Sequence, residues 1–239
     1  MTQTIETAVI LAAGRGTRLQ PYTFDIPKGF MQLGDEKLIE RSVRILKENG
    51  IKNIIIGTGH LHEHYEKFAK ENGLQTFLSP DYATTGSFHT LIYGSELIKG
   101  DFLLLESDLL YHSDAIKGLL NATKKDLILT SGFTQSEDEV YVEVQDQKLV
   151  NLSKKKEDLG SIDAELVGIW KISLNLLEKL KAHHKEAEDG TKKDYEMAIA
   201  KLSSEHPVSV LKIERLAWCE IDNQEHLERA KREILPRLD

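Results

Sequence analysis

Short runs of consecutive apolar residues constrain the fold of this chain more than any other feature. They are residues 8–11, 54–56, 102–105 and 127–129. A strand with one solvent-exposed face alternates apolar and polar residues. A strand that is covered on both faces, as in a parallel sheet enclosed by helices, is apolar throughout. Between the runs, helical spacing places Ile39, Val43 and Leu46 on one face. The pattern predicts an α/β fold with a doubly wound, mostly parallel mixed sheet.

The second half of the chain has a different pattern. Residues 140–144 alternate, and a polar turn leads from them into residues 148–150, which predicts an antiparallel hairpin. Further elements are expected as a strand over 165–172, a charged helix over about 174–187 and a final helix over about 224–235. We expect these elements to form a small β/α lobe beside the sheet, within a single domain that spans residues 1–239.

The net charge and the cysteine content limit the classes of binding partner and the cellular compartment that we expect. The 239 residues carry a formal net charge of −8, which argues against nucleic acid or an anionic membrane as the main partner. The single cysteine, Cys219, excludes a disulfide framework and fits a reducing compartment. Residues 1–7 lack the pattern of a signal peptide, and the apolar runs are too short to cross a bilayer. We therefore expect a cytoplasmic protein.

The first apolar run leads directly into a glycine loop, LAAGRGTRL, over residues 11–19. Its two glycines let the backbone turn tightly and point N–H groups at a phosphate. Arg15 and Arg18 add charge-assisted donors suited to a triphosphate, and Lys28 follows in Ile-Pro-Lys-Gly-Phe. Neither the third glycine of a dinucleotide fingerprint nor the Gly-Lys-Ser/Thr of a P-loop is present. The loop indicates phosphate binding of another class, and a loop that needs glycine only to turn is the alternative.

The glycine loop and the downstream Pro-Lys together resemble the signature of the sugar-phosphate nucleotidyltransferases and their choline-phosphate relatives. The resemblance spans roughly residues 7–235. It implies magnesium-dependent transfer of a nucleoside monophosphate, with about 1–135 binding the NTP and about 136–239 binding the acceptor. It also implies that Arg18 contacts the NTP phosphates and that Lys28 neutralises charge at the reacting phosphorus. The nucleotide-binding residues expected from it are Leu11, Ala12, Ala13, Gly14, Arg15, Gly16, Thr17, Thr58, Gly59, Ser87 and Ser107.

Two aspartates stand where this family places metal ligands. Asp108 follows the buried run at 102–105, and Asp222 lies in Trp-Cys-Glu-Ile-Asp-Asn. Ligands of open α/β sheets bind outside the carboxyl ends of the strands, and Mg²⁺ prefers carboxylate oxygens. A single Asp after a strand is more often a turn former or a helix cap. Because both positions match the family pattern, we expect Asp108 and Asp222 to hold Mg²⁺, with Asp108 also catalytic.

Several segments resemble the phosphocholine and 2-aminoethylphosphonate cytidylyltransferases more than the sugar enzymes. Residues 55–61 resemble the second strand and turn of that group, and residues 83–88 take the place of its base-reading loop. Small polar groups there, notably Ser87, suit hydrogen bonds to a pyrimidine edge. The resemblance therefore implies CTP as the nucleotide.

The acceptor is inferred from the composition of the expected acceptor pocket. A quaternary ammonium has no N–H and needs aromatic faces, yet only 7% of the residues are aromatic. The segments that resemble the aromatic box of phosphocholine enzymes are residues 139–141 and 194–196, where acids replace tryptophans. A primary ammonium needs carboxylate acceptors. The expected acceptor-binding groups are Glu165, Asp194, Tyr195 and Glu196, and Lys-Gly-Phe at 28–30, in place of the usual Lys-Ala, also resembles the phosphonate branch.

A lysine run at 154–156 falls where family members place a lysine for the acceptor phosphate. Charge runs are more often solvated faces, so Lys154 and Lys155 stay as joint candidates and Lys156 is assigned to the surface. The expected reaction joins CMP from CTP to 2-aminoethylphosphonate. Phosphocholine and a sugar 1-phosphate are the alternative acceptors, and the sequence does not indicate an oligomeric state. A nucleotide-sensing regulator is disfavoured because Lys28, Asp108 and Asp222 are all present.

Overall fold

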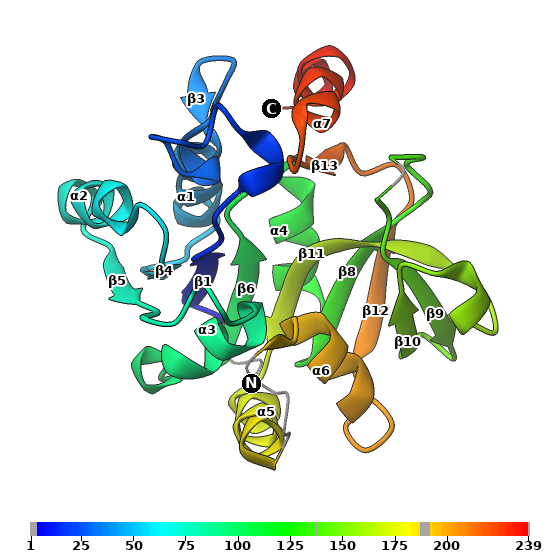
Figure 1. Ribbon diagram of the computed structural model, residues 1–239. Coiled ribbons are helices and arrows are strands. Elements are labelled where there is room, and N and C mark those ends of the chain that lie inside the picture. Colours follow the sequence, from blue (N-terminus) through cyan, green and yellow to red (C-terminus); the bar gives the residue numbers. More distant parts are fainter. Residues whose placement is uncertain (1–3, 137, 187–191, 239) are drawn as a thin grey trace.

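The computed structural model describes residues 4–136, 138–186 and 192–238, and it confirms the predicted α/β fold around one mixed sheet (Figure 1). The sheet has nine strands in the order β5 (Gln75–Leu78), β4 (Asn53–Thr58), β1 (Thr7–Ala12), β6 (Phe102–Glu106), β11 (Ala164–Ile172), β8 (Leu127–Ser131), β12 (Ser209–Ile213), β10 (Lys148–Ser153) and β9 (Tyr141–Gln145). Two smaller sheets pair β2 (Gln32–Leu33) with β3 (Glu36–Lys37) and β7 (Leu109–Tyr111) with β13 (Trp218–Glu220).

The strand directions show how the two halves of the chain combine. β4, β1 and β6 are parallel, as the apolar runs predict, and the unpredicted edge strand β5 is parallel to β4. β11 is antiparallel to both β6 and β8, and it lies between them. A strand from the second half therefore completes the centre of the sheet, and the hairpin strands extend the same sheet at its far edge.

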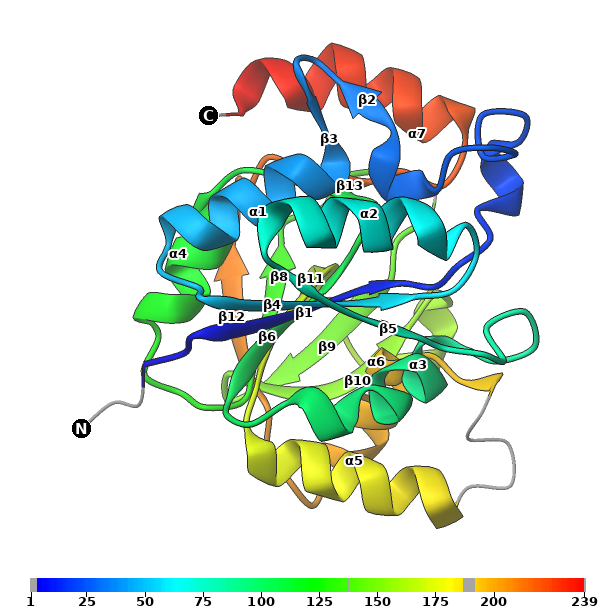
Figure 2. The same ribbon diagram turned by 90° about the vertical axis from the view of Figure 1, so that its left-hand side faces the viewer.

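Helices cover both faces of the sheet (Figure 2). One layer consists of α1 (Leu38–Glu48), α2 (His62–Asn72) and α4 (Asp114–Asn121), and the other of α3 (Ser87–Tyr93), α5 (Leu174–Glu186) and α6 (Tyr195–Leu202). Successive residues of a strand alternate between the two cores: Ile10 packs toward the first layer, and Val9 and Leu11 pack toward the second. Both layers need apolar partners, which explains why these strands lack alternation.

The predicted hairpin is confirmed. β9 and β10 are antiparallel, and the connecting residues Asp146 and Gln147 have φ values of 51° and 60°. Two consecutive residues with positive φ make a type I′ turn, whose twist matches that of the flanking strands.

The final helix differs from the prediction of one continuous helix over 224–235. The α-helix α7 spans Gln224–Arg229, a π-helical turn follows over Ala230–Ile234, and a 3-10 turn ends the segment at Arg237. Pro236 has no amide hydrogen with which to continue the helical bonds. The predicted stripe of Leu227, Ala230 and Ile234 is nonetheless buried in a third core that also contains Leu19, Leu33 and Ile221, so the C-terminal helical segment packs against residues 19–38.

The charged helix predicted over about 174–187 is observed as α5, and the last predicted position, Ala187, lies outside the described residues. Among the residues that the structure describes, no helix combines the length and the apolar character needed to cross a bilayer.

Candidate active site

The carboxyl ends of β1, β4 and β6 meet at one edge of the sheet. Strand register places Leu11 of β1 opposite Gly57 of β4 and opposite Glu106 of β6. The chain then continues into the glycine loop after β1 and into the turn that carries Asp108 after β6. The phosphate-binding loop and the first acidic group therefore leave the sheet side by side.

The glycine loop depends on its backbone conformation. Gly16 has φ +61°, and a Cβ at this position would lie 3.0 Å from Cγ of Lys28. Gly59 lies against the other side of the loop, because a Cβ there would come within 2.6 Å of the carbonyl oxygen of Ala13. A Cβ on Gly14 would come within 4 Å of no atom that the structure describes beyond its chain neighbours. Glycine at 16 and 59 thus lets Lys28 and the neighbouring turn pack closely against the loop.

The glycine loop borders a cavity of about 270 Å³, here called the loop pocket. Predicted residues that line it are Leu11, Ala12, Ala13, Gly14, Gly16, Lys28, Ser87, Ser107 and Asp108. Arg15 and Thr17 are on the loop outside this lining. Thr58 requires a correction as a nucleotide contact: its side chain is fully buried and its hydroxyl donates to the carbonyl of Phe77 at 2.9 Å.

Close contacts explain why residue 29 is a glycine. A Cβ at this position would lie 2.7 Å from the hydroxyl oxygen of Tyr65 and 3.2 Å from the carbonyl oxygen of Ser107. Tyr65 is itself buried and lines the loop pocket. The glycine after Lys28 therefore makes room for a tyrosine hydroxyl at the base of the pocket.

Lys28 connects the two predicted metal ligands. Its Nζ donates to Oδ2 of Asp108 at 2.8 Å and also to Oδ1 of Asp222. The second oxygen of Asp222 accepts from Arg18 at 2.8 Å. Burial opposes the charge on Lys28, but the two carboxylates outweigh it and raise the pKa of Lys28. Burial likewise opposes ionisation of Asp222, yet Lys28 and Arg18 lower the pKa of Asp222 to about 2. Lys28 and Asp222 are therefore both charged near neutral pH.

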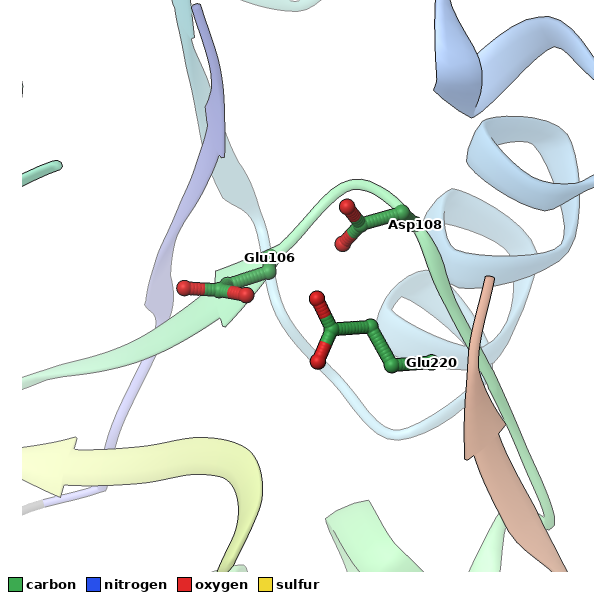
Figure 3. A group of neighbouring side chains, drawn as sticks. All are labelled: Glu106, Asp108 and Glu220. Atoms are coloured by element: carbon green, nitrogen blue, oxygen red, sulfur yellow. The ribbon is translucent and has the colours of Figure 1, made fainter. Parts of the chain in front are cut away.

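Asp108 also belongs to an acidic cluster with Glu106 and Glu220, shown in Figure 3. One carboxylate oxygen from each residue lies within 4.8 Å of the others, and the buried Oδ1 of Asp108 has no hydrogen-bond partner within the described part of the chain. Burial, followed by repulsion from neighbouring acids, raises the pKa values of Glu106 and Glu220 well above the ordinary range. Such hard oxygen donors suit Mg²⁺, which would lower the repulsion among them.

A second cavity, here called the acid pocket, adjoins the first. It is narrow, at about 50 Å³, and Glu106 lines both cavities. Its carboxylates are Glu106, Asp138, Glu139, Glu165, Glu196 and Glu220. Tyr195 and Trp218 supply its aromatic surface, while the other tryptophan, Trp170, is fully buried in the core. A cavity lined this way suits groups that carry N–H or O–H donors better than a quaternary ammonium, which has none.

The predicted acceptor residues divide between the two cavities. Glu165, Tyr195 and Glu196 line the acid pocket, and burial, followed by repulsion from Asp194, raises the pKa of Glu196 to about 7. Asp194 lies elsewhere than predicted, because it borders the loop pocket and accepts a hydrogen bond from Ser87 at 3.2 Å. This bond ties the predicted base-reading loop to the start of α6.

The structure distinguishes the candidate lysines. Lys154 Nζ lies 2.6 Å from Oδ1 of Asp138, an acid-pocket residue. The side chain of Lys155 is exposed, and Nζ of Lys156 lies 4.7 Å from the ring centre of Tyr141. Lys154 is therefore the lysine of the run that reaches the site.

The sequence profile of one protein family, the MobA-like NTP transferase domain, matches residues 8–142, which is more than half of the chain. The chain belongs to the MobA-like NTP transferase family. The matched segment contains the glycine loop, Lys28 and Asp108.

Curated proteins similar to this chain include two that are named for cytidylyl or related transfer. A bifunctional IPC transferase and DIPP synthase of Thermococcus kodakarensis is 25% identical over 233 residues, covering 96% of this chain and 51% of the relative. The chain thus spans about half the length of that relative. A CTP:phosphoglutamine cytidylyltransferase of Campylobacter jejuni is 26% identical over 194 residues, covering 74% of this chain and 77% of the relative.

Among solved structures, the inositol-1-phosphate CTP transferase from T. maritima superposes on this chain with a TM-score of 0.85. The superposition covers 99% of this chain and 97% of the other at 17% identity, which shows a shared fold.

Glu106, Glu220 and Asp138 were not among the site residues predicted from the sequence. Glu106 and Glu220 each stand two residues before a predicted metal ligand, in Glu-Ser-Asp and Glu-Ile-Asp. Side chains two residues apart in an extended segment point to the same side, so this spacing could have identified them. Asp138 is preceded by no such pattern, because its role depends on contacts with Arg18 and Lys154.

Proposed function

We propose that the protein transfers CMP from CTP to 2-aminoethylphosphonate and releases pyrophosphate. The observation that carries this proposal is the junction of two unlike cavities at Glu106: one bordered by a glycine loop and cations, the other lined with carboxylates. The first suits a triphosphate, and the second suits an acceptor with a primary ammonium. The names of relatives that use CTP support the nucleotide.

In the proposed reaction, an oxygen of the phosphonate forms a bond to the α-phosphorus of CTP. The bond from that phosphorus to the oxygen of the leaving pyrophosphate breaks. The phosphonate oxygen is already anionic near neutral pH, so no protein group has to remove a proton. The main barrier is repulsion between two anions, and positioned cations are the way to lower it.

The chain offers specific groups for this task. Lys28 is held at the loop pocket by Asp108 and Asp222, and Arg18 lies at the edge of the loop beside Asp222. Loop amides at residues 13–16 complete a cradle for the triphosphate. Lys28 and Arg18 stabilise negative charge that develops on the phosphoryl oxygens and the leaving group.

Magnesium fits the acidic residues of the site. The free Oδ1 of Asp108, with Glu106 and Glu220 nearby and Asp222 beside Lys28, provides hard oxygen ligands for Mg²⁺. When bound, the ion would supply charge neutralisation for the phosphate oxygens. The chain's own part is to hold these carboxylates correctly spaced.

The acid pocket determines the choice of acceptor. Glu196 has a buried oxygen that finds no hydrogen-bond partner among the residues that the structure describes, and Glu165 lines the same cavity. An ammonium group can donate to such oxygens, whereas choline cannot, because it has no N–H. A polyol phosphate is the second candidate: its hydroxyl groups also donate to carboxylates, and the relative named for IPC transfer aligns with 96% of this chain.

A panel assay of pyrophosphate release tests the function. The four common ribonucleotides are each combined with 2-aminoethylphosphonate, phosphocholine, inositol 1-phosphate, glucose 1-phosphate and ethylphosphonate. We expect CTP with 2-aminoethylphosphonate to give the highest kcat/KM, about a hundredfold above ethylphosphonate, because the ammonium then gains buried carboxylate partners. A clear preference for inositol 1-phosphate would assign the acid pocket to a polyol. Equal turnover of ethylphosphonate would refute recognition of the amine.

A further inference from the structure

Two cations from different parts of the chain meet on one carboxylate. NH1 of Arg18 lies 2.9 Å from Oδ2 of Asp138, and Nζ of Lys154 lies 2.6 Å from Oδ1 of the same group. Arg18 belongs to the 3-10 turn at the end of the glycine loop, and Lys154 follows β10. Arg18 is proposed above to face the triphosphate, and Lys154 is the lysine that reaches the acid pocket. Asp138 therefore bridges the two halves of the site.

We propose that Asp138 acts as an internal substitute for the acceptor anion: in the free protein its carboxylate occupies the place between Arg18 and Lys154 that the phosphonate takes in the complex. This inference rests on the proposed function for the identity of the anion. A phosphonate, like a carboxylate, presents separate oxygens to two donors, so the same pair of cations serves both. The acceptor must displace Asp138 to bind.

The environment of Asp138 supports an exchangeable contact. Its side chain is 25% exposed, and those of Arg18 and Lys154 are 56% and 58% exposed, so the contact can open without disturbing the core. Burial raises the pKa of Asp138, but its bonds with Lys154 and Arg18 outweigh this and lower it, so the group is anionic near neutral pH. The acid pocket that it lines measures about 50 Å³, room for only a few water-sized groups. Release of Asp138 would widen it.

An internal competitor lowers the apparent affinity for the anion that replaces it. The apparent dissociation constant rises as the fraction of molecules with the contact open becomes smaller. Partly exposed ion pairs are weak, so we expect a roughly three- to tenfold effect on acceptor binding. The chemical step should change much less, because Asp138 does not take part in it.

The test is Asp138→Asn, which removes the anion and keeps the shape. We expect the KM of the acceptor to fall about three- to tenfold while kcat stays within about twofold of wild type. Glu157→Gln, an exposed change of the same charge on the neighbouring segment, should leave KM unchanged. A raised KM in Asp138→Asn would overturn the proposal, because Asp138 would then bind the acceptor or maintain the site.

A double-mutant cycle separates a local contact from a general charge effect. In a Lys154→Met background, Asp138→Asn should no longer lower KM, because one of the two cations it competes for is gone. An undiminished decrease in that background would show that only overall charge matters, and it would overturn the proposal.

A binding measurement keeps this inference distinct from the proposed function. Inorganic pyrophosphate, titrated calorimetrically, probes Arg18 without any acceptor. We expect Asp138→Asn to bind it more tightly than wild type and Glu157→Gln to bind it as wild type does. If no acceptor of the panel is turned over but this shift is found, the acceptor assignment fails and the exchange at Asp138 stands. If the acceptor is turned over without either shift, the exchange fails and the function stands.

Discussion

At the scale of single residues, the pairing of Lys28 with Asp108 and Asp222 decides both stability and chemistry. The Lys28 side chain is only 16% exposed, and that of Asp222 is 2% exposed. Removing one partner from a buried ion network leaves the others uncompensated, which costs about 3 kcal/mol or more. The same lysine is placed to stabilise charge at the phosphorus.

Replacement of Lys28 by methionine should therefore have two effects. Without Mg²⁺, the midpoint of thermal unfolding should fall by roughly 6–12 °C, and Mg²⁺ should restore part of it by neutralising the acids that have lost their lysine partner. Pyrophosphate release should fall about a hundredfold, with less than a tenfold change in CTP affinity. Calorimetry and steady-state kinetics give the two results. A change confined to CTP affinity would show that Lys28 only binds the nucleotide.

The variant Asp108→Asn tests whether Asp108 is a metal ligand without changing the fold. The amide preserves the shape but lacks the charge, so pyrophosphate release should drop by roughly a hundredfold or more while the circular dichroism spectrum remains that of wild type. Glu63→Gln, whose native side chain is 70% exposed on α2, serves as the matched control. Turnover of Asp108→Asn near the wild-type rate would remove Asp108 from the site.

The pKa of Glu196, about 7, predicts a pH dependence for the acceptor. A raised carboxyl pKa means that Glu196 is protonated below about pH 7 and becomes an acceptor for ammonium above it. Between about pH 6 and pH 8, the KM for the aminophosphonate acceptor should fall more in the wild type than in Glu196→Gln, because the acceptor's own titration is the same for both proteins. Parallel curves for the two proteins would contradict the role of Glu196.

At the scale of elements, the glycine loop depends on both its left-handed backbone and its contact with Lys28. Gly16 and Gly50 both have positive φ, at +61° and +86°, but only Gly16 of the two has neighbours within 4 Å of a built Cβ. Gly16→Ala and Gly50→Ala should each lower the free energy of unfolding by about 1–2 kcal/mol. Only Gly16→Ala should also raise the KM for CTP, by about tenfold, because its methyl group displaces Lys28. Equal kinetic behaviour of the two variants would show that the loop does not position the lysine.

Element by element, the sequence predicted what local patterns encode. The apolar runs predicted β1, β4, β6 and β8, and the polar turn predicted the hairpin of β9 and β10. The edge strand β5 was missed because its ends, Gln75 and Leu78, are exposed and leave no apolar run. Glu106 and Glu220 were readable from Glu-x-Asp spacing, whereas Asp138 required three-dimensional contacts.

At the scale of the whole molecule, the insertion of β11 between β6 and β8 assembles one site from both halves of the chain. No local pattern specifies that insertion, because strand order is set by long-range packing. It places Glu165 at one wall of the acid pocket and leaves Glu106 between the two cavities. The cationic side chains of Arg18, Lys28 and Lys154 thereby lie at one site of a protein whose net charge is negative.

The acidic cluster predicts a global response to magnesium. Because the folded-state pKa values of Glu106 and Glu220 are raised, the folded protein holds protons that the unfolded chain has lost above about pH 4.5. Their contribution to stability is therefore present at low pH and is lost as pH rises through the folded values. Millimolar Mg²⁺ should raise the unfolding midpoint by about 3–6 °C at about pH 8 and by less at about pH 5.5, where protons compete. An equal shift at both pH values, or the same shift in Asp108→Asn, would argue against this cluster as the ion site.

The central claim is that a glycine cradle and an acid-held ion bring two anions together at one phosphorus. A crystal structure with CTP and Mg²⁺ tests it most directly. We predict the triphosphate over residues 13–18, with Lys28 against it and the ion on Asp108 and its acidic neighbours Glu106, Glu220 or Asp222. A nucleotide bound away from that loop, or an ion remote from Asp108, would contradict the account.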